Sequence, residues 1–489
     1  MNLTTSEMLL AILPEIALVV LAGLLMLVSM LKRERLDRTI GCLTAGGMLV
    51  IALLAFLFSM PKAEPMLIWG GMLRLDSAAF VFRIIFLVGA GLTAIFSCTE
   101  EHVRRRPEFY ILLTLSTMGM SLMASSADLI MLFLAIETAS IPLYVMAGIK
   151  IKEEKSVEAG LKYFLFGAMS SAMMVYGFTL IYGFGGTTHL YEIAENVAGQ
   201  SIPLAGFVAA AVLVLAGFAF KISAVPFHFW APDVYEGAPT SVTGFLSTAS
   251  KAAGFAALMR FLLILFAAEH SPVWQAMLSA LAVVSMFTGN LVAIPQKNIK
   301  RMLAYSSIAQ AGYILVGLAS RSILGFSGAI YYLIAYMATN LALFALVGWI
   351  GRKTGSDDLS AFAGLNRRAP AMAFAMLIGL LSLGGIPPFG GFFAKVLVFG
   401  AAVESGWAWL AIVGVVNSVI GLYYYLRVLK VMYVDEPSDA SALKAKNSLW
   451  LVGLIICLTL ILVLGIALNP WFGFASWAGN GFELTLNML

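Results

Sequence analysis

The chain has 489 residues, of which 61% are hydrophobic and 11% are charged, and its mean hydropathy is +0.94. Soluble domains carry about 25% charged residues, so this composition excludes a soluble globular protein. The formal net charge of +4 comes from basic residues that are dispersed among loops. This is not the clustered pattern of a nucleic-acid-binding protein, and we expect no nucleic acid as a partner.

Apolar runs recur from one end of the chain to the other, and each is long enough to cross a hydrocarbon core about 30 Å thick. Because the runs are continuous rather than alternating, they predict helices and not barrel strands. The sequence therefore predicts an all-α polytopic membrane protein with about 14 transmembrane helices. The predicted spans are 8–31, 39–59, 75–98, 109–126, 128–148, 158–184, 203–231, 240–267, 272–293, 301–320, 322–350, 369–402, 407–434 and 448–470.

The distribution of lysine and arginine supports this number of spans. Loops that follow odd-numbered spans, with the adjoining span ends, hold 20 of the 30 basic residues, beginning with the segment 32–38. Loops that follow even-numbered spans hold three, which are Lys62, Arg74 and Arg321. Since basic loops stay cytoplasmic, we expect both termini on the opposite side of the membrane.

Four ionisable residues lie in the middle of predicted spans: Glu137, Lys221, Lys251 and Lys395. Each costs about 2.5–3.5 kcal/mol to insert at a helix centre, so pairing or function must offset the cost. Glu137 is either a structural carboxylate bonded to a neighbouring helix or an acid paired with a lysine, and we favour the pair. The alternative for Lys251 is a side chain that reaches the interface, but its depth, eleven residues after Thr240, favours a buried site.

Other ionisable residues in the spans are weaker candidates. His228, in PFHFW, is either a proton relay or a core histidine, and the sequence favours neither. Arg83, Arg260 and Arg427 stay protonated, so we expect them to hold helices together. Glu15 is expected near the outer interface.

Two spans contain residues that break helices. The segment 384–391, GGIPPFGG, lies just before Lys395, and Pro226 follows Lys221 by five residues. Lipid cannot satisfy the backbone groups that such breaks free, so a break is tolerated only beside protein or a water-filled cavity. Two interrupted spans in corresponding positions of two halves are typical of inverted-repeat transporters. The sequence thus predicts two discontinuous helices in two inverted five-helix repeats.

The predicted organisation has four parts: an N-terminal three-helix region at 1–108, a first repeat at 109–267, a second, inverted repeat at 268–434, and a C-terminal helix and tail at 435–489. The repeat rests on the placement of the breaks, because the two halves share little sequence identity. Each break would form a hydrated half-channel with a lysine as its proton-binding group. Burial disfavours a charged lysine and a nearby carboxylate favours it, so an acid and a lysine in contact would titrate as a coupled pair.

The sequence has no evident site for a metal, a haem, a flavin or an iron–sulfur cluster. Cys42, Cys98 and Cys457 lie far apart inside apolar runs, and the four histidines show no metal or haem spacing. A phosphate-binding loop is also absent. We therefore expect no cofactor in this chain and any redox chemistry in a partner.

Three segments resemble the antiporter-like subunits of respiratory complex I, the NADH-quinone oxidoreductase. They are KISAVPFHFWAPDVYEGAPTSVTGFLSTASKAAGF at 221–255, IPQKNIKRMLAYSSIAQAGY at 294–313 and GGIPPFGGFFAK at 384–395. The resemblance covers nearly the full length. It implies a subunit of the membrane arm in a bacterial inner membrane, with both termini on the periplasmic side, the lipid bilayer around it and other membrane-arm subunits as neighbours. It also implies proton movement here, while partner subunits hold NADH, FMN, iron–sulfur clusters and quinone.

The resemblance assigns roles to the buried charges by motif. Glu137 and Lys221 match the family's acid–lysine pair. Lys251 matches its bridging lysine, and Lys395 matches the lysine of the second broken helix, towards the outer exit.

One departure concerns the tenth span. Related subunits often have histidine there, in a YSSISH-like stretch, whereas this chain has YSSIAQ with Gln310. Because glutamine cannot titrate, water or Tyr305 would have to bridge Lys251 and Lys395.

Two other functions share the lysines and the broken helices. An Mrp-type cation/proton antiporter subunit would exchange sodium for protons without NADH activity. A purely structural subunit with a vestigial polar axis would leave proton flux insensitive to substitution of the buried charges.

Overall fold

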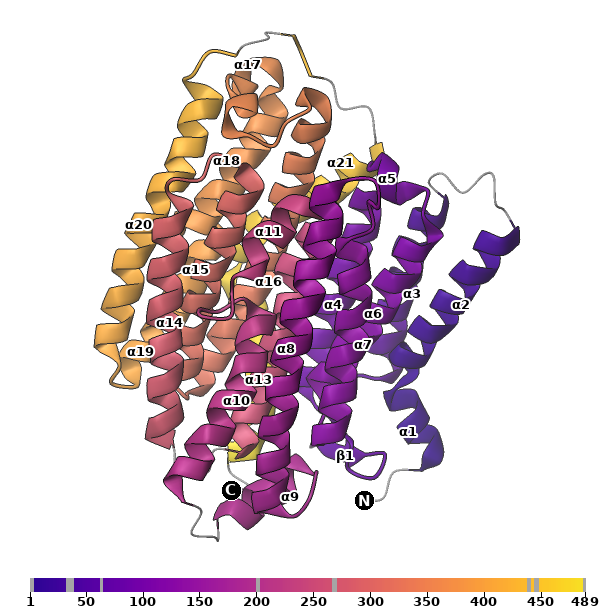
Figure 1. The fold of residues 1–489 in the computed structure, drawn as a ribbon, viewed down its shortest axis with the longest axis vertical. Coiled ribbons are helices and arrows are strands. Elements are labelled where there is room, and N and C mark those ends of the chain that lie inside the picture. Colours follow the sequence, from indigo (N-terminus) through magenta and orange to yellow (C-terminus); the bar gives the residue numbers. More distant parts are fainter. Residues whose placement is uncertain are drawn as a thin grey trace.

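We describe the protein from a computed structural model that places residues 4–31, 39–61, 65–198, 203–265, 271–437, 441–443 and 448–486. The basic segment 32–38, Lys62, Lys444, Lys446 and the predicted boundary between residues 267 and 268 lie outside these described residues. Almost all of the described chain is helical, as the sequence predicts (Figure 1).

The N-terminal region contains two long helices and a β-hairpin before the first deeply buried helix. Its elements are α1 (Thr5–Ala11), α2 (Leu13–Leu31), α3 (Thr39–Phe58), β1 (Met66–Ile68), β2 (Leu73–Leu75), α4 (Ser77–Ser97) and α5 (Glu101–Arg104). The strands are antiparallel and pair Met66 with Leu75 and Ile68 with Leu73.

The next part of the chain contains the first predicted break. Its elements are α6 (Pro107–Ser125), α7 (Leu129–Ala147), α8 (Glu154–Gly185), α9 (Leu190–Ala198), α10 (Leu204–Ile222), α11 (Trp230–Gly237), α12 (Thr240–Phe245), the π-helical turn η1 (Leu246–Ser250) and α13 (Lys251–Leu265).

The last part contains the second break. Its elements are α14 (Ser271–Ala293), α15 (Ile299–Ala319), α16 (Ile323–Thr354), the 3-10 turn η3 (Leu359–Phe362), α17 (Leu365–Arg368), α18 (Pro370–Gly384), α19 (Gly390–Glu404), α20 (Ala408–Tyr433), α21 (Ser448–Ile466) and α22 (Leu468–Leu486).

Eleven of the described helices are long and apolar enough to cross a membrane. The three other predicted spans, 109–126, 240–267 and 369–402, coincide with α6, with α12–η1–α13 and with α18–α19. The number of fourteen spans and the relation between the two repeats stay predictions. The sequence did not predict the hairpin, because each of its strands has only three residues. It did not predict α22 either, because this helix directly continues the last apolar run.

Both predicted breaks are present. After α10, Ser223 has a left-handed backbone with φ of 60°, and the indole of Trp230 donates to the carbonyl of Phe220 at 3.1 Å. Between α18 and α19, Gly385 has φ of 79°, and a Cβ at this position would lie 2.9 Å from Cδ of Lys395. Glycine at 385 therefore allows both the turn and the close approach of the lysine.

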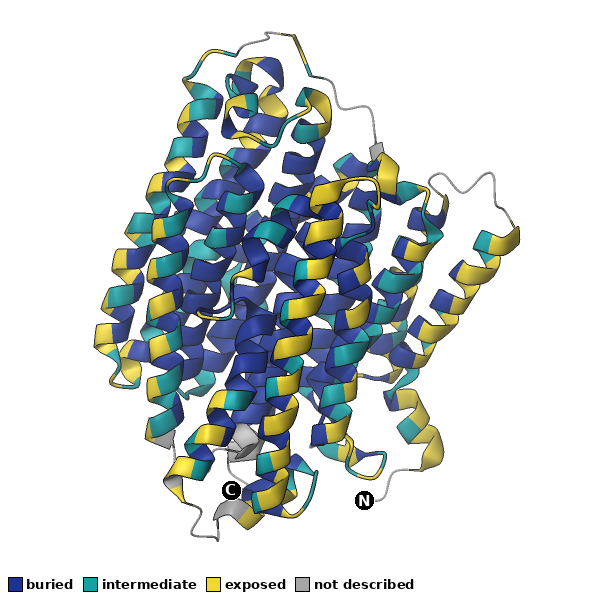
Figure 2. Ribbon diagram, viewed as in Figure 1, coloured by how far each residue is buried: buried dark blue, intermediate teal, exposed yellow. Residues whose placement is uncertain are grey.

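The centre of the bundle is α16, in which every residue from Gly325 to Ile350 is buried. It packs against α12, α15, α18, α19, α21 and α22. By contrast, α2, α3, α8 and α20 carry exposed apolar side chains on the outside of the molecule (Figure 2). This distribution is typical of a bundle that packs its own helices inside and meets lipid tails outside.

Arginines within the predicted spans hold segments of the bundle together, as predicted. Arg83 of α4 pairs with Glu15 of α2 at 2.8 Å, so Glu15 is buried and paired within the bundle, a role that its sequence context did not indicate. Arg260 of α13 donates to both carboxylate oxygens of Asp76, at 2.8 and 3.0 Å. Arg427 of α20 donates to the carbonyl of Ile294 at 2.6 Å.

The two ends of the molecule differ in what they carry. Figure 1 shows α5 and α17, with their basic residues, at the end opposite to the marked N- and C-termini. These two described basic segments therefore lie at the same end of the molecule, as the alternation along the sequence predicts.

The Asp76–Arg260 pair yields a stability prediction. Asp76→Ala leaves a buried guanidinium without its counter-charge, so the free energy of unfolding should fall by about 3–5 kcal/mol. The measurement is thermal unfolding of the detergent-solubilised protein. Asp435→Ala is the control, because its partner Lys430 lies 3.7 Å away on the surface and such pairs contribute about 0–1 kcal/mol. Equal shifts for the two variants would contradict this account.

Candidate functional site

The four mid-span charges come from four different helices of the bundle interior. Lys221, Lys251 and Lys395 are only 5%, 1% and 6% exposed, respectively, and Glu137 is half-buried. A buried ammonium is tolerated only where oxygen atoms accept its hydrogen bonds. The partners of each lysine therefore define the site.

Lys221 is held by α7, the helix that carries Glu137. Its Nζ donates to Oγ of Ser140 at 2.8 Å, and Ser140 lies one turn after Glu137. Glu137 in turn accepts a hydrogen bond from Oγ of Ser171 in α8 at 2.5 Å. Among the described residues, no ion pair and no hydrogen bond joins the acid directly to the lysine, and each is held by a different serine.

A small cavity lies between these two serine contacts. It has a volume of about 10 Å³, and its polar lining includes Ser140, Ser170, Ser171, Tyr144 and Lys221. That volume is close to what one water molecule needs. Because hydroxyl groups and an ammonium line the cavity, it is suited to a water that joins the Glu137 side to the Lys221 side.

Lys251 follows the π-helical turn η1 directly, and such turns are frequent at functional sites. Its Nζ donates to the carbonyl and to Oγ of Ser307 in α15, at 2.6 and 2.5 Å. The ring centre of Tyr336 lies 5.9 Å from the same nitrogen. The charge-assisted bonds and the aromatic face offset part of the desolvation cost.

Lys395 is held by the break between α18 and α19. Its Nζ donates to the carbonyls of Leu383 at 3.0 Å and Gly384 at 3.1 Å, and to Oγ of Ser418 at 2.6 Å. The two carbonyls close α18, where the last helical turn leaves acceptors without intrahelical partners. The ring of Tyr313 lies 4.9 Å from Nζ.

Gln310 connects the second break to its surroundings. Its amide nitrogen donates to the carbonyl of Leu383, the acceptor that Lys395 also uses, and to the hydroxyl of Tyr425, both at 3.2 Å. Its amide oxygen accepts from Tyr332. A residue that cannot titrate therefore still joins Lys395 to Tyr425.

Tyr425 completes the connection towards Lys251. Its hydroxyl lies 2.5 Å from Oγ of Ser306, the neighbour of Ser307 in α15. A series of hydrogen-bonded or adjacent groups thus leads from Lys251 to the second break. Sequence reasoning did not single out Tyr425, because it is one of three consecutive tyrosines and their spacing does not say which one faces the interior.

Tyr305 and His228 lie outside this series. Tyr305 is half-buried, and in the described chain no hydrogen bond joins its hydroxyl to the lysines. His228 is 6% exposed, its ring lies 4.5 Å from that of Phe229, and its Nδ1 has no partner among the described residues.

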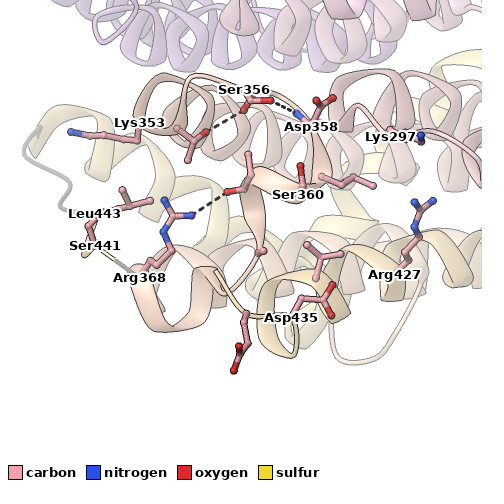
Figure 3. A pocket seen from close by; sticks show the side chains of 16 residues that line it. Lys297, Lys353, Ser356, Asp358, Ser360, Arg368, Arg427, Asp435, Ser441 and Leu443 are labelled. Carbon is pink, nitrogen blue, oxygen red and sulfur yellow. Dashed lines mark hydrogen bonds between the residues drawn. The ribbon is translucent and has the colours of Figure 1, made fainter. Parts of the chain in front are cut away.

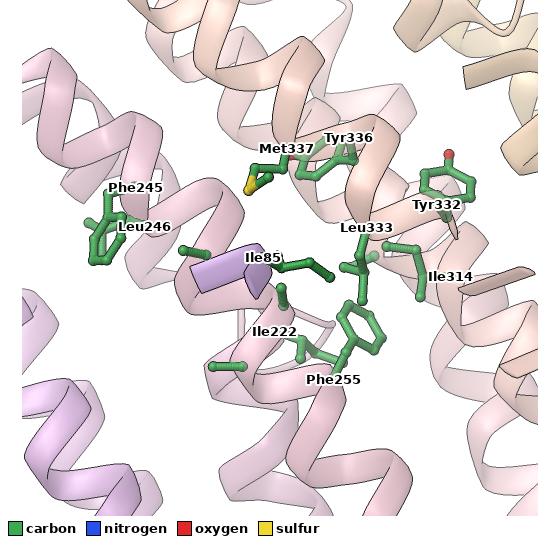
Figure 4. Close-up of a cluster of buried hydrophobic side chains, with 14 of the residues drawn as sticks. Ile85, Ile222, Phe245, Leu246, Phe255, Ile314, Tyr332, Leu333, Tyr336 and Met337 are labelled. Atoms are coloured by element: carbon green, nitrogen blue, oxygen red, sulfur yellow. The ribbon is translucent and has the colours of Figure 1, made fainter. Parts of the chain in front are cut away.

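Lys221 and Lys251 have apolar neighbours in the sequence. Figure 4 shows Ile222 and Phe255 in one apolar cluster, and both follow the lysines closely in sequence. Gly254 packs against Lys221, since a Cβ there would lie 3.0 Å from Cγ of the lysine. Within the described residues no hydrogen bond links the two lysines. The hydrogen-bonded groups therefore fall into two sets, one around Lys221 and one that leads from Lys251 to Lys395.

A cavity near α17 is not part of this arrangement. It has a volume of about 940 Å³ and is lined by residues that include Lys353, Arg368, Arg427 and Asp435 (Figure 3). None of the four mid-span charges lines it.

Comparison with known proteins gives consistent matches. The family described as NADH:quinone oxidoreductase/Mrp antiporter, TM, matches residues 126–421. The NADH-quinone oxidoreductase subunit N of Moorella thermoacetica is 44% identical over 437 residues, which are 88% of this chain and 90% of the relative.

Solved structures agree with the fold. A chain of respiratory complex I from Thermus thermophilus with bound aureothin is 31% identical, with a TM-score of 0.79 over 94% of this chain and 98% of that one. A chain of the Mrp complex from a Dietzia species has a TM-score of 0.85 over 99% of both chains at 23% identity, which is a likeness of fold.

The second break yields a prediction about packing. A Cβ at Gly465 of α21 would collide with the carbonyl oxygen of Pro388 in the break, so Gly465→Ala should destabilise the protein by about 1–3 kcal/mol. The measurement is thermal unfolding in detergent. Gly400→Ala in α19 is the control, because no atom lies within 4 Å of its Cβ position. A Gly465→Ala variant as stable as Gly400→Ala would show that α21 does not fix the break.

Proposed function

The chain belongs to the NADH:quinone oxidoreductase/Mrp antiporter family, and from this premise we propose that Glu137, Lys221, Lys251 and Lys395 carry protons across the membrane. The protein is a multi-pass membrane-arm subunit of NADH-quinone oxidoreductase with a role in proton translocation. The observation that supports the proposed route is the series of groups that joins Lys251 to Lys395.

The outer half of the route begins at Lys251. Its ammonium gives a proton to the hydroxyl of Ser307, and Ser306 and Tyr425 pass it on, because a hydroxyl can accept one proton and donate another. Gln310 cannot release a proton. It holds the Tyr425 hydroxyl in place, and a water beside it carries the proton to Lys395.

The inner half consists of Glu137 and Lys221. A charged Glu137 favours the ammonium form of Lys221, and loss of that charge favours release of its proton. The cavity between the two serines supplies the connection. Transfer from Lys221 to Lys251 requires water, because no hydrogen bond links the two lysines within the described residues, and this transfer is the controlled step that prevents leakage at rest.

Electron transfer takes place in partner subunits in this proposal. NADH, FMN, iron–sulfur clusters and quinone bind there, and this chain contributes as part of a translocase without a redox centre of its own. The absence of metal-ligand and redox motifs in the sequence supports this division.

We also propose a bacterial inner membrane, with both termini on the periplasmic side. The basic residues at the opposite end of the molecule support this orientation.

An Mrp-type antiporter is the second candidate function. Its support is the fold that this chain shares with a chain of the Mrp complex. Sodium-dependent proton exchange in vesicles that lack NADH activity would favour this candidate, whereas co-migration of the tagged chain with NADH oxidation on a native gel would exclude it.

Lys251→Met tests the route at its most buried charge. The substitution removes an ammonium without leaving an unpaired charge, so the complex should assemble. Proton transfer should fall by about 10²-fold or more, as for loss of a positioned proton carrier. The measurement is NADH-driven proton uptake by inverted vesicles, with the exposed Lys152→Met as control. Normal uptake by an assembled Lys251→Met complex would refute the route.

Tyr425→Phe tests the connection to the second break. It removes the hydroxyl that joins Ser306 to Gln310, so proton uptake should slow about ten-fold. Tyr423→Phe is the control in the same run of tyrosines, because Tyr423 is 59% exposed and lies outside the series. Equal uptake rates for the two variants would place the path elsewhere.

A further inference from the structure

In the proposed route Lys251 has no hydrogen-bonded proton donor on the Lys221 side, because no hydrogen bond links the two lysines within the described residues. A second small cavity suggests a source for its proton. It has a volume of about 10 Å³ and lies where the end of α4 and the residues just after it meet α12, α16 and α21. Its polar lining comprises Thr99, Glu100, Thr240, Ser241 and Arg352. Like the first cavity, it has space close to that of one water molecule.

Glu100 forms the inner side of this cavity. Its side chain is 11% exposed, and its Oε1 accepts a hydrogen bond from the backbone nitrogen of Ser241 at 2.8 Å. Arg352 forms the outer side, with 33% exposure, and its Nη1 lies 3.8 Å from the carboxylate. A second guanidinium nitrogen donates to Thr99 at 2.9 Å. An arginine that is partly exposed thus covers an acid that is nearly buried.

Ser241 provides an independent sign of hydration. The residue is 7% exposed, it lines the cavity, and its hydroxyl has no hydrogen-bond partner within the described residues. A buried hydroxyl without a protein partner is costly unless a water satisfies it. The cavity beside it is of the size that such a water requires.

A polar track leads from the cavity towards Lys251 along α12 and η1. Thr240 and Gly244 line the cavity, and Thr248 follows one turn later and donates to the carbonyl of Gly244 at 2.7 Å. Lys251 comes after a further turn. Thr240, Gly244, Thr248 and Lys251 are all buried. This face of the helix therefore carries two hydroxyl groups and a glycine, where a membrane helix would ordinarily carry leucine or valine.

The facing helix continues the track. Leu341 and Phe344 of α16 close the inner end of the cavity. Just beyond them, the amide of Asn340 donates to the hydroxyl of Tyr336 at 2.8 Å, and the ring of Tyr336 covers the Lys251 ammonium. One apolar turn therefore separates the cavity from polar groups in contact with the lysine.

We propose that Glu100 and Arg352 form a proton entrance to Lys251 from the end of the molecule that carries α5 and α17. The Glu100 carboxylate takes a proton from water at the surface when Arg352 swings aside. The proton then passes through water in the cavity and along the hydroxyls to the Lys251 amine, after that lysine has given its own proton towards Lys395. No bond other than those to the proton is made or broken.

The inference rests on the proposed function, since the entrance supplies protons to Lys251, the lysine that the proposed route uses. It assigns to the N-terminal region, which provides Glu100, a part in proton supply that lies outside both predicted repeats. Glu100 acts through water and not by contact with Lys251, so it is a proton-collecting residue.

Glu100→Gln tests the entrance in the assembled complex. The amide can still accept the bond from the Ser241 nitrogen, but it cannot carry a proton. We expect normal assembly on a native gel and a fall of about ten-fold in NADH-driven proton uptake by inverted vesicles. Glu100→Asp, which restores a carboxylate, should recover part of the rate. Glu101→Gln, at the exposed neighbouring position, is the matched control and should pump normally.

Ser241→Ala provides a second test that does not depend on the acid. The hydroxyl has no protein partner among the described residues, so its removal breaks no protein hydrogen bond and a structural role predicts no change. Slower proton uptake in this variant supports a hydrated entrance.

The outcomes separate the entrance from the proposed function. If Lys251→Met stops uptake while Glu100→Gln and Ser241→Ala pump like Glu101→Gln, the entrance is wrong and the route stands. If Lys251→Met also pumps normally, the route itself fails.

Discussion

The hydrogen bonds between the Lys395 ammonium and the carbonyls at the end of α18 are the interaction on which the site depends. In lipid, neither an ammonium nor a freed carbonyl can find water, so each is costly alone. Together they satisfy one another, and the glycines and prolines of the break become tolerable in the middle of a span. Gly385 is required at the point where the chain turns against the lysine.

The other lysines follow the same principle with different acceptors. Lys221 uses a serine of the helix that carries Glu137, and Lys251 uses both oxygens of Ser307. Because hydroxyls donate as well as accept, these contacts satisfy charge and at the same time offer places for a proton. Within the described residues no hydrogen bond links Lys221 to Lys251, so the two sets of polar groups are separate, as a protein that must not leak protons needs.

Sequence reasoning predicted the elements whose cause is local. Apolar length predicted the helices, and Pro226 and GGIPPFGG predicted the breaks. It did not predict contacts between helices, because the partner of a buried group depends on which faces meet. Ser140 binds the lysine and Ser171 binds the acid that motif comparison pairs. Tyr425 carries the connection for which Tyr305 was considered, and Glu15 is the partner of a buried arginine.

The most direct test of the central claim is a cryo-EM structure of the assembled enzyme that resolves ordered water, at rest and during turnover. The account predicts that Gln310 and Tyr425 join Lys251 to Lys395 in both states, and that water joins Lys221 to Lys251 only during turnover. A dry, apolar gap between Lys251 and Lys395 in both states would contradict it.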